Sequence, residues 1–111
     1  MGLGREVRSW AKVWQGAAAG GGTDSFTYLG SPPFVCAGVL LTVGSSGPDI
    51  SLLNLNGQTI YTISTTATEL VIAVALNWSL VLQEHDVLEI APGAGSSMQI
   101  LVSGYFTTYA E

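Results

Sequence analysis

The sequence predicts an all-β protein, an antiparallel β-sandwich of about eight strands in a jelly-roll-like order, with an N-terminal arm. Two observations predict this fold. Beyond Thr23 the chain is rich in valine, isoleucine, threonine and aromatic residues, and turn-forming residues interrupt them about every ten positions. No long helical pattern occurs in this part of the chain, and a length of 111 residues fits a single domain.

The expected strands lie between short segments rich in glycine, proline, serine and aspartate. These breaks are at 30–33, 44–49, 64–68, 83–86 and 92–97. We expect strands near 25–29, 34–43, 49–55, 58–63, 69–76, 78–83, 86–91 and 98–108. The chain therefore divides into an arm with a Gly/Ala-rich tether at 1–22 and a β-sandwich at 23–111.

Asn56-Gly57 is the sharpest turn signal, since both central residues of a type I′ hairpin turn need a positive φ. Pairing Leu55 with Gln58 places Leu53 opposite Ile60, and the neighbouring pair on the other face is apolar as well. A small sandwich has only one core, so a second apolar face needs another layer or another subunit. We expect another subunit.

The charges are divided unevenly along the chain. All lysine and arginine lies within the first twelve residues, at Arg5, Arg8 and Lys12, whereas all of the eight carboxylates except Glu6 lie beyond them. Opposite potentials steer and orient docking between proteins. The division therefore predicts attachment to another protein or to further copies of this chain.

The arm also carries an apolar stripe. Four residues would share one face of a helix, which docking would have to stabilise at this length: Val7, Trp10, Ala11 and Trp14. An extended arm is the alternative, and Gly16–Gly22 is either a flexible tether or a closely packed extended passage. The predicted protein-interface residues are Arg5, Val7, Arg8, Trp10, Lys12 and Trp14. The tryptophans could instead fold back on their own domain.

Glu84-His85-Asp86 is the only place where a histidine meets carboxylates, the groups that a metal site or acid–base pair would use. We interpret it as an exposed turn in which Asp86 bonds its own backbone, since adjacent turn residues point in different directions. A metal shared on a trimer axis is the alternative. Because there is also no Gly-x-Ser-x-Gly motif and no phosphate-binding loop, we predict no catalytic, cofactor-binding or metal-binding residues, and no enzyme.

Other partners and cross-links are disfavoured. Cys36 is the single cysteine, so we expect a small core side chain and no internal disulfide. A body with carboxylates and no cation would repel nucleic acid. No apolar run reaches the ~20 residues of a membrane span. The sequence therefore predicts neither nucleic acid nor membrane as a partner.

Two segments resemble the small β-sandwich virion proteins of tailed phages. Trp78–Ile90 is similar to their strand, turn, Gly-Asp-x-Leu and strand unit, although His85 stands where that pattern usually has glycine. Met98–Tyr105 contains Val-Ser-Gly and resembles their closing strand. The order of elements over roughly 25–106 fits the same plan.

This resemblance implies a non-enzymatic structural protein located in the virion. The expected role is a capsid decoration or cement protein, which stabilises a tailed-phage head by forming a homotrimer and docking its arm on neighbouring subunits. The expected partners are further copies of the chain, the major capsid protein or another virion protein. A neck or tail accessory protein is the first alternative. The second is a glycan-binding β-sandwich that uses Tyr105, Phe106 and Tyr109.

Overall fold

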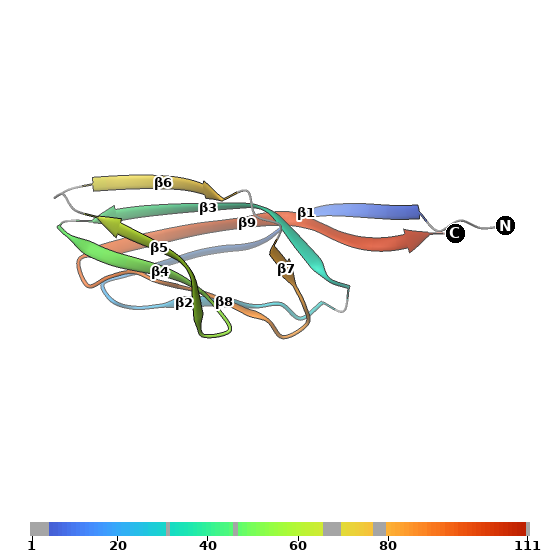
Figure 1. Cartoon of the computed structure of the whole chain (residues 1–111), viewed down its shortest axis with the longest axis horizontal. Helices are drawn as coiled ribbons and strands as arrows, with labels where there is room; N and C mark the ends of the chain where they lie inside the picture. Colours follow the sequence, from blue (N-terminus) through green and yellow to red (C-terminus); the bar gives the residue numbers. More distant parts are fainter. Residues whose placement is uncertain (1–4, 31, 46, 66–69, 77–79, 111) are drawn as a thin grey trace.

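The computed structural model of the protein describes residues 5–30, 32–45, 47–65, 70–76 and 80–110, with the backbone alone described for 5–9, 70–76 and 107–110. These residues form strands and connecting turns (Figure 1). No helix in the described ranges is long and apolar enough to cross a membrane.

The described strands form two antiparallel sheets, which confirms the predicted β-sandwich. Sheet A has the order β1-β9-β3-β6, with the short β7 also paired to β3, and sheet B has the order β2-β8-β4-β5. β4 and β5 follow one another within sheet B, and β6 and β7 within sheet A, whereas every other step along the described strands changes sheet, as in a jelly roll. The bounds are β1 Arg5–Ala19, β2 Asp24–Thr27, β3 Phe34–Ser45, β4 Asp49–Leu55, β5 Gln58–Thr65, β6 Leu70–Leu76, β7 Leu80–Leu82, β8 Val87–Ala91 and β9 Ser96–Ala110.

The predicted arm forms β1, a strand in addition to the eight that the sequence predicted. Of the two conformations expected for it, the structure shows the extended one, since β1 pairs with β9 from Arg5 opposite Ala110 to Ala19 opposite Ser97. The helical stripe therefore does not form. Gly20 and Gly21 follow with φ angles of 62° and 76°, values that favour glycine, and turn the chain toward β2. The predicted boundary at residue 22 falls in this turn.

β1 and β3 each carry a β-bulge beside the same part of β9. The extra residues are Val13, between Lys12 and Trp14, and Ala37, between Cys36 and Gly38. One extra residue exchanges the two faces of a strand. Beyond its bulge, β1 therefore turns its even-numbered residues from the outside of sheet A toward the core.

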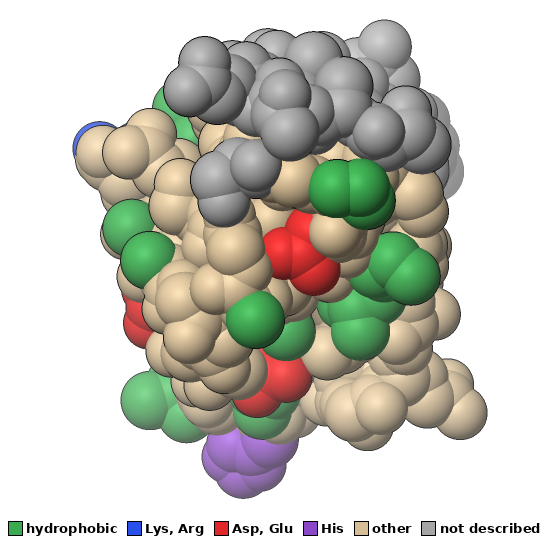
Figure 2. Space-filling model, turned by 90° about the vertical axis from the view of Figure 1, so that its left-hand side faces the viewer, with side chains coloured by type: hydrophobic (Ala, Val, Ile, Leu, Met, Phe, Trp, Pro, Cys, Tyr) green, Lys and Arg blue, Asp and Glu red, His purple; other side chains and the backbone are tan. Residues whose placement is uncertain are grey.

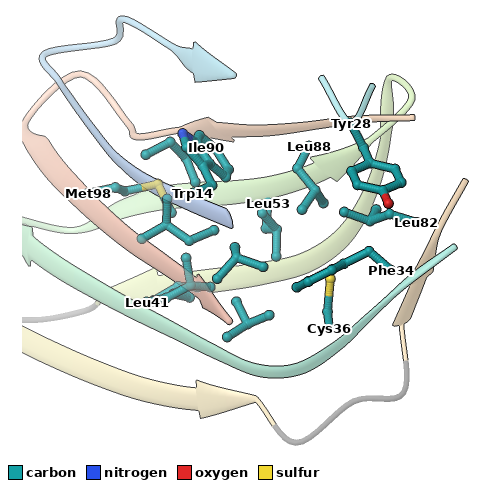
Figure 3. Packing of buried hydrophobic residues seen from close by; sticks show 14 of the residues in the cluster. Trp14, Tyr28, Phe34, Cys36, Leu41, Leu53, Leu82, Leu88, Ile90 and Met98 are labelled. Atoms are coloured by element: carbon teal, nitrogen blue, oxygen red, sulfur yellow. The ribbon is translucent and has the colours of Figure 1, made fainter. Parts of the chain in front are cut away.

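The core lies between the two sheets (Figure 3). Its buried side chains include Phe34, Leu41, Leu53, Leu82, Leu88, Ile90, Met98, Ile100 and Val102. The prediction that Cys36 is a core side chain is confirmed, because it is buried in this cluster, and burial raises the pKa of its thiol to about 12. This thiol is therefore unreactive in the folded chain.

The predicted β4–β5 hairpin forms, but its register differs by one residue beyond the turn. Asn56 and Gly57 have φ angles of 51° and 82°, and Leu55 pairs with Gln58, as expected. A bulge at Ile60 then places Leu53 opposite Tyr61, so the predicted pair of Leu53 with Ile60 is wrong. The bulge moves Tyr61 to the core side, and the outer face of this hairpin is more polar than the sequence predicted.

Candidate functional site

The outer faces of the two sheets differ in chemistry. On sheet B, polar residues occupy many of the outer register positions: Ser25, Thr27, Asn54, Thr62, Ser64 and Glu89. The outer positions also hold the apolar residues Ile50, Leu52, Val87 and Ala91, of which Ile50 is 57% exposed. On sheet A, Trp10 is 65% exposed, Leu40 43% and Val81 40%. The outer face of sheet A therefore exposes apolar residues of β1, β3 and β7, whereas the sequence predicted a second apolar face on the β4–β5 hairpin of sheet B.

Trp10 and Tyr105 form the most prominent feature of that face. They are opposite one another on β1 and β9, and their ring centroids lie 4.9 Å apart with an interplanar angle of 56°. Cross-strand aromatic pairs stabilise one another in this way. We call this pair the aromatic knob. Because the rings are tilted, the knob is an apolar projection rather than a flat aromatic platform.

A groove lies on the same face of sheet A, farther from the chain termini than the knob, and residues of β1, β9 and β3 line it. It consists of two adjoining hollows of ≈ 470 and ≈ 490 Å³, which share Ala17, Thr42 and Gln99. The hollows exist because small side chains occupy positions where larger ones would fill the surface. We call them the outer groove, and its lining includes Gln15, Ala17, Ala19, Leu40, Thr42, Gly44, Ser97, Gln99 and Leu101.

The division of charge along the sequence becomes a division between the sheets. β1 carries every lysine and arginine of the chain, together with Glu6. The described carboxylates outside β1 lie on sheet B or in its connecting turns: Asp24, Asp49, Glu84, Asp86 and Glu89. Viewed from the end opposite the chain termini, Figure 2 shows several acidic side chains and a basic one only at the margin.

Asp49 stabilises the loop that leads into β9. Its carboxylate accepts hydrogen bonds from the Gly95 N–H at 2.8 Å, the Ser96 hydroxyl at 3.0 Å and the Ile50 N–H at 3.0 Å. These bonds, first that of Gly95, lower the pKa of Asp49. Through these hydrogen bonds the Asp49 carboxylate, which we call the carboxylate clamp, connects the start of β4 to the loop before β9.

The Glu84-His85-Asp86 turn is exposed, as the sequence predicted. Asp86 accepts a bond from the Gln83 N–H at 2.8 Å, which confirms that it bonds its own turn, and another from the Asn56 side-chain amide at 2.9 Å. These two bonds, first that of Asn56, lower the pKa of Asp86. His85 and Glu84 are 4.0 Å apart and well exposed. No group of three or more potential metal ligands gathers within the described ranges.

The predicted interface residues fall into three groups. Trp10 and Lys12 lie exposed on the outer face of sheet A, where the Lys12 ammonium donates to the Gln15 side-chain oxygen at 3.1 Å. Trp14 is buried in the core and stacks on Phe26, with ring centroids 5.9 Å apart. The other three are on β1, with side chains outside the described part of the structure: Arg5, Val7 and Arg8.

The aromatic residues proposed for glycan binding are also separated. Tyr105 belongs to the knob, whereas Phe106 faces the core, 5.1 Å from Phe34 between ring centroids. The side chain of Tyr109 lies outside the described residues. The sequence reading missed the outer groove. Its signal was the run of small residues at Gly16–Ala19, for which the sequence leaves open a flexible tether or a closely packed extended passage; the structure shows that these residues end β1.

No family model and no curated protein matches the chain. Among solved structures, the chain is similar to a family two carbohydrate esterase from Clostridium thermocellum in complex with cellohexaose, with 17% identity and a TM-score of 0.43. The match covers 86% of this chain and 33% of the esterase chain.

Proposed function

We propose that this protein is a non-enzymatic assembly protein, and that it binds its partners through β1 and the outer face of sheet A. One observation carries this proposal. Trp10 is largely exposed on the strand that bears every lysine and arginine of the chain, and the described carboxylates beyond β1 lie on the other sheet or in its connecting turns. Tryptophan, tyrosine and arginine dominate the binding energy of many protein interfaces.

The resemblance to virion proteins gives the proposed setting. In that setting the chain is a capsid decoration or cement protein of a tailed-phage head, it forms a homotrimer, and it binds the major capsid protein or another virion protein. Several identical contacts in one oligomer multiply a modest affinity through effective concentration. A neck or tail location is the alternative within the same class.

The residues with reactive side chains support a role without catalysis. The single histidine of the chain, His85, lies on an exposed turn with Glu84 as its acidic neighbour at 4.0 Å. The thiol of Cys36 is buried, and the nearby turn carboxylate of Asp86 is occupied by hydrogen bonds. None of these groups meets the geometry of a nucleophile held by a base.

Labelling of intact particles tests the proposal. An antibody raised against the full chain is applied to purified tailed-phage particles produced by the genome that encodes it, and bound gold is located by electron microscopy. Gold on the heads supports a decoration protein, and gold on necks or tails supports the accessory alternative. Particles that contain no labelled chain, although the chain is expressed in the infected cell, would overturn the proposal.

A further inference from the structure

We infer that the outer groove of sheet A receives the aromatic knob of a second copy of this chain. This inference rests on the proposed assembly function and names one of its contacts. The knob consists of Trp10 and Tyr105. The groove lies over the part of β1 after Lys12 and over the residues of β9 that pair with it.

The knob and the groove lie on the same face but too far apart to meet within one molecule. Trp10 is opposite Tyr105, whereas the groove lies beside Leu101 and Gln99 of the same strand. Four to six residues along a strand span about 13–20 Å. Trp10 therefore cannot fill the groove of its own chain, whereas the Trp10 of another copy can.

The groove suits an indole ring in size and chemistry. Each hollow, at ≈ 470 and ≈ 490 Å³, is an open depression with room for an indole ring. Leu40 and Leu101 offer apolar contact to a ring. Gln15, Gln99 and Thr42 offer oxygen acceptors to an indole N–H, which needs a partner when it is buried.

Electrostatic repulsion between copies is expected to be weakest at the outer face of sheet A. The chain has a formal net charge of −5, so two copies repel one another over most of their surface. Among the side chains described on the outer face of sheet A, Lys12 is the charged one, and the described carboxylates beyond β1 belong to sheet B and its turns. Two copies that meet through sheet A therefore keep their described carboxylates apart.

A surface that bears both a knob and a matching groove is self-complementary. A reciprocal pair about a two-fold axis places each knob in the groove of the other copy, and a closed ring of three places each knob in the next copy. Both arrangements use the same contact. The mass of the complex in solution tells which one the protein adopts.

Two substitutions test the contact from its two sides. Trp10→Ala removes the knob, and Ala17→Arg places a long charged side chain at an exposed position in the groove. We expect sedimentation equilibrium to show self-association of the wild-type chain and an at least tenfold weaker association of each variant. Ile50→Ser removes an exposed apolar side chain from sheet B, and this control should associate as the wild type does.

Mixing the two variants distinguishes a specific contact between knob and groove from a non-specific weakening of self-association by either substitution. The Ala17→Arg chain keeps its knob, and the Trp10→Ala chain keeps its groove, so the mixture should form hetero-oligomers that neither variant forms alone. Fluorescence energy transfer between differently labelled variants measures them. An absence of hetero-oligomers, when both variants have wild-type melting temperatures, would overturn the inference.

The remaining outcomes distinguish this inference from the proposed function. If the wild-type chain associates but neither substitution weakens the association, the groove contact is wrong and assembly through another surface stands. If the wild-type chain stays monomeric at millimolar concentration, the contact is also wrong, and particle labelling still decides the assembly role. Binding of the wild-type chain on a glycan array, lost in Trp10→Ala while the oligomer persists, would likewise overturn it in favour of a glycan site.

Discussion

Trp10 and Trp14 lie four positions apart on one strand and on opposite faces of sheet A. In a regular strand two residues at this spacing share a face. The extra residue Val13, opposite the Ser103–Val102 step of β9, exchanges the faces between them. Trp10 is therefore 65% exposed and Trp14 only 9% exposed. One bulge lets β1 contribute a tryptophan to the core and present another to a partner.

The two tryptophans should consequently differ in their contribution to stability. Trp14→Ala leaves a cavity in the core and should lower the free energy of unfolding by about 3–5 kcal/mol. Trp10→Ala loses mainly the contact with the Tyr105 ring and should lower it by less than about 1 kcal/mol. Urea unfolding of both variants measures these values, and equal losses would show that the two faces are assigned incorrectly.

Gly104 should be intolerant of any side chain. A Cβ at this position would overlap the backbone oxygen of Val35, beside the bulge at Ala37. Since backbone cannot move aside as a side chain can, Gly104→Ala should cost at least about 2 kcal/mol of unfolding free energy. Gly47→Ala is the matched control, because a Cβ there meets nothing within 4 Å. A thermal melt in which both variants equal the wild type would contradict the bulge geometry.

Among the residues that the structure describes, Asn56 and His85 have positive φ angles without being glycine, and substitution by glycine should have opposite effects at the two positions. His85, at 75°, has a left-handed backbone conformation that glycine adopts more readily than a residue with a Cβ, so His85→Gly should stabilise by about 0.5–1 kcal/mol. Asn56, at 51°, donates to Asp86 and accepts from the Val87 N–H, so Asn56→Gly should destabilise by about 1 kcal/mol. Chemical denaturation would refute this account if the signs were reversed.

Asp49 should make stability depend on acid pH. Its pKa is lowered in the folded chain, chiefly by the Gly95 N–H, relative to an ordinary value of 3.8. A lowered pKa stabilises the fold above the unfolded-state pKa, and this stabilisation is lost as the pH falls through the folded-state pKa. Asp49→Asn should therefore melt below the wild type at neutral pH, because an amide nitrogen would face a backbone N–H.

The difference in melting temperature should shrink as the pH falls below 3.8 and through the lowered folded-state pKa of Asp49, because the wild-type carboxylate then becomes protonated. Glu84→Gln is the control, because it also replaces a carboxylate by an amide, but at an exposed position that lies 4.0 Å from His85. Its melting temperature should follow that of the wild type throughout. An Asp49→Asn deficit that persists unchanged in acid would exclude the carboxylate clamp.

Local chemistry alone determined most of the fold. Alternating β-branched and aromatic residues, interrupted by turn formers, located eight strands correctly, and Asn56-Gly57 located the hairpin turn. These features depend only on residues that are close together in the chain, so the sequence alone is enough to predict them. The separation of the lysine and arginine residues from most carboxylates along the chain can also be seen in the sequence alone.

Only the tertiary structure decided which face each residue occupies. The bulges at Val13, Ala37 and Ile60 depend on how neighbouring strands pack, and each exchanges the faces of everything beyond it. The helical spacing of Trp10 and Trp14 was real in the sequence, but pairing with β9 supplied the backbone bonds and held the segment extended. The outer groove likewise exists only where strands distant in sequence lie side by side, since small residues make a hollow only between larger neighbours.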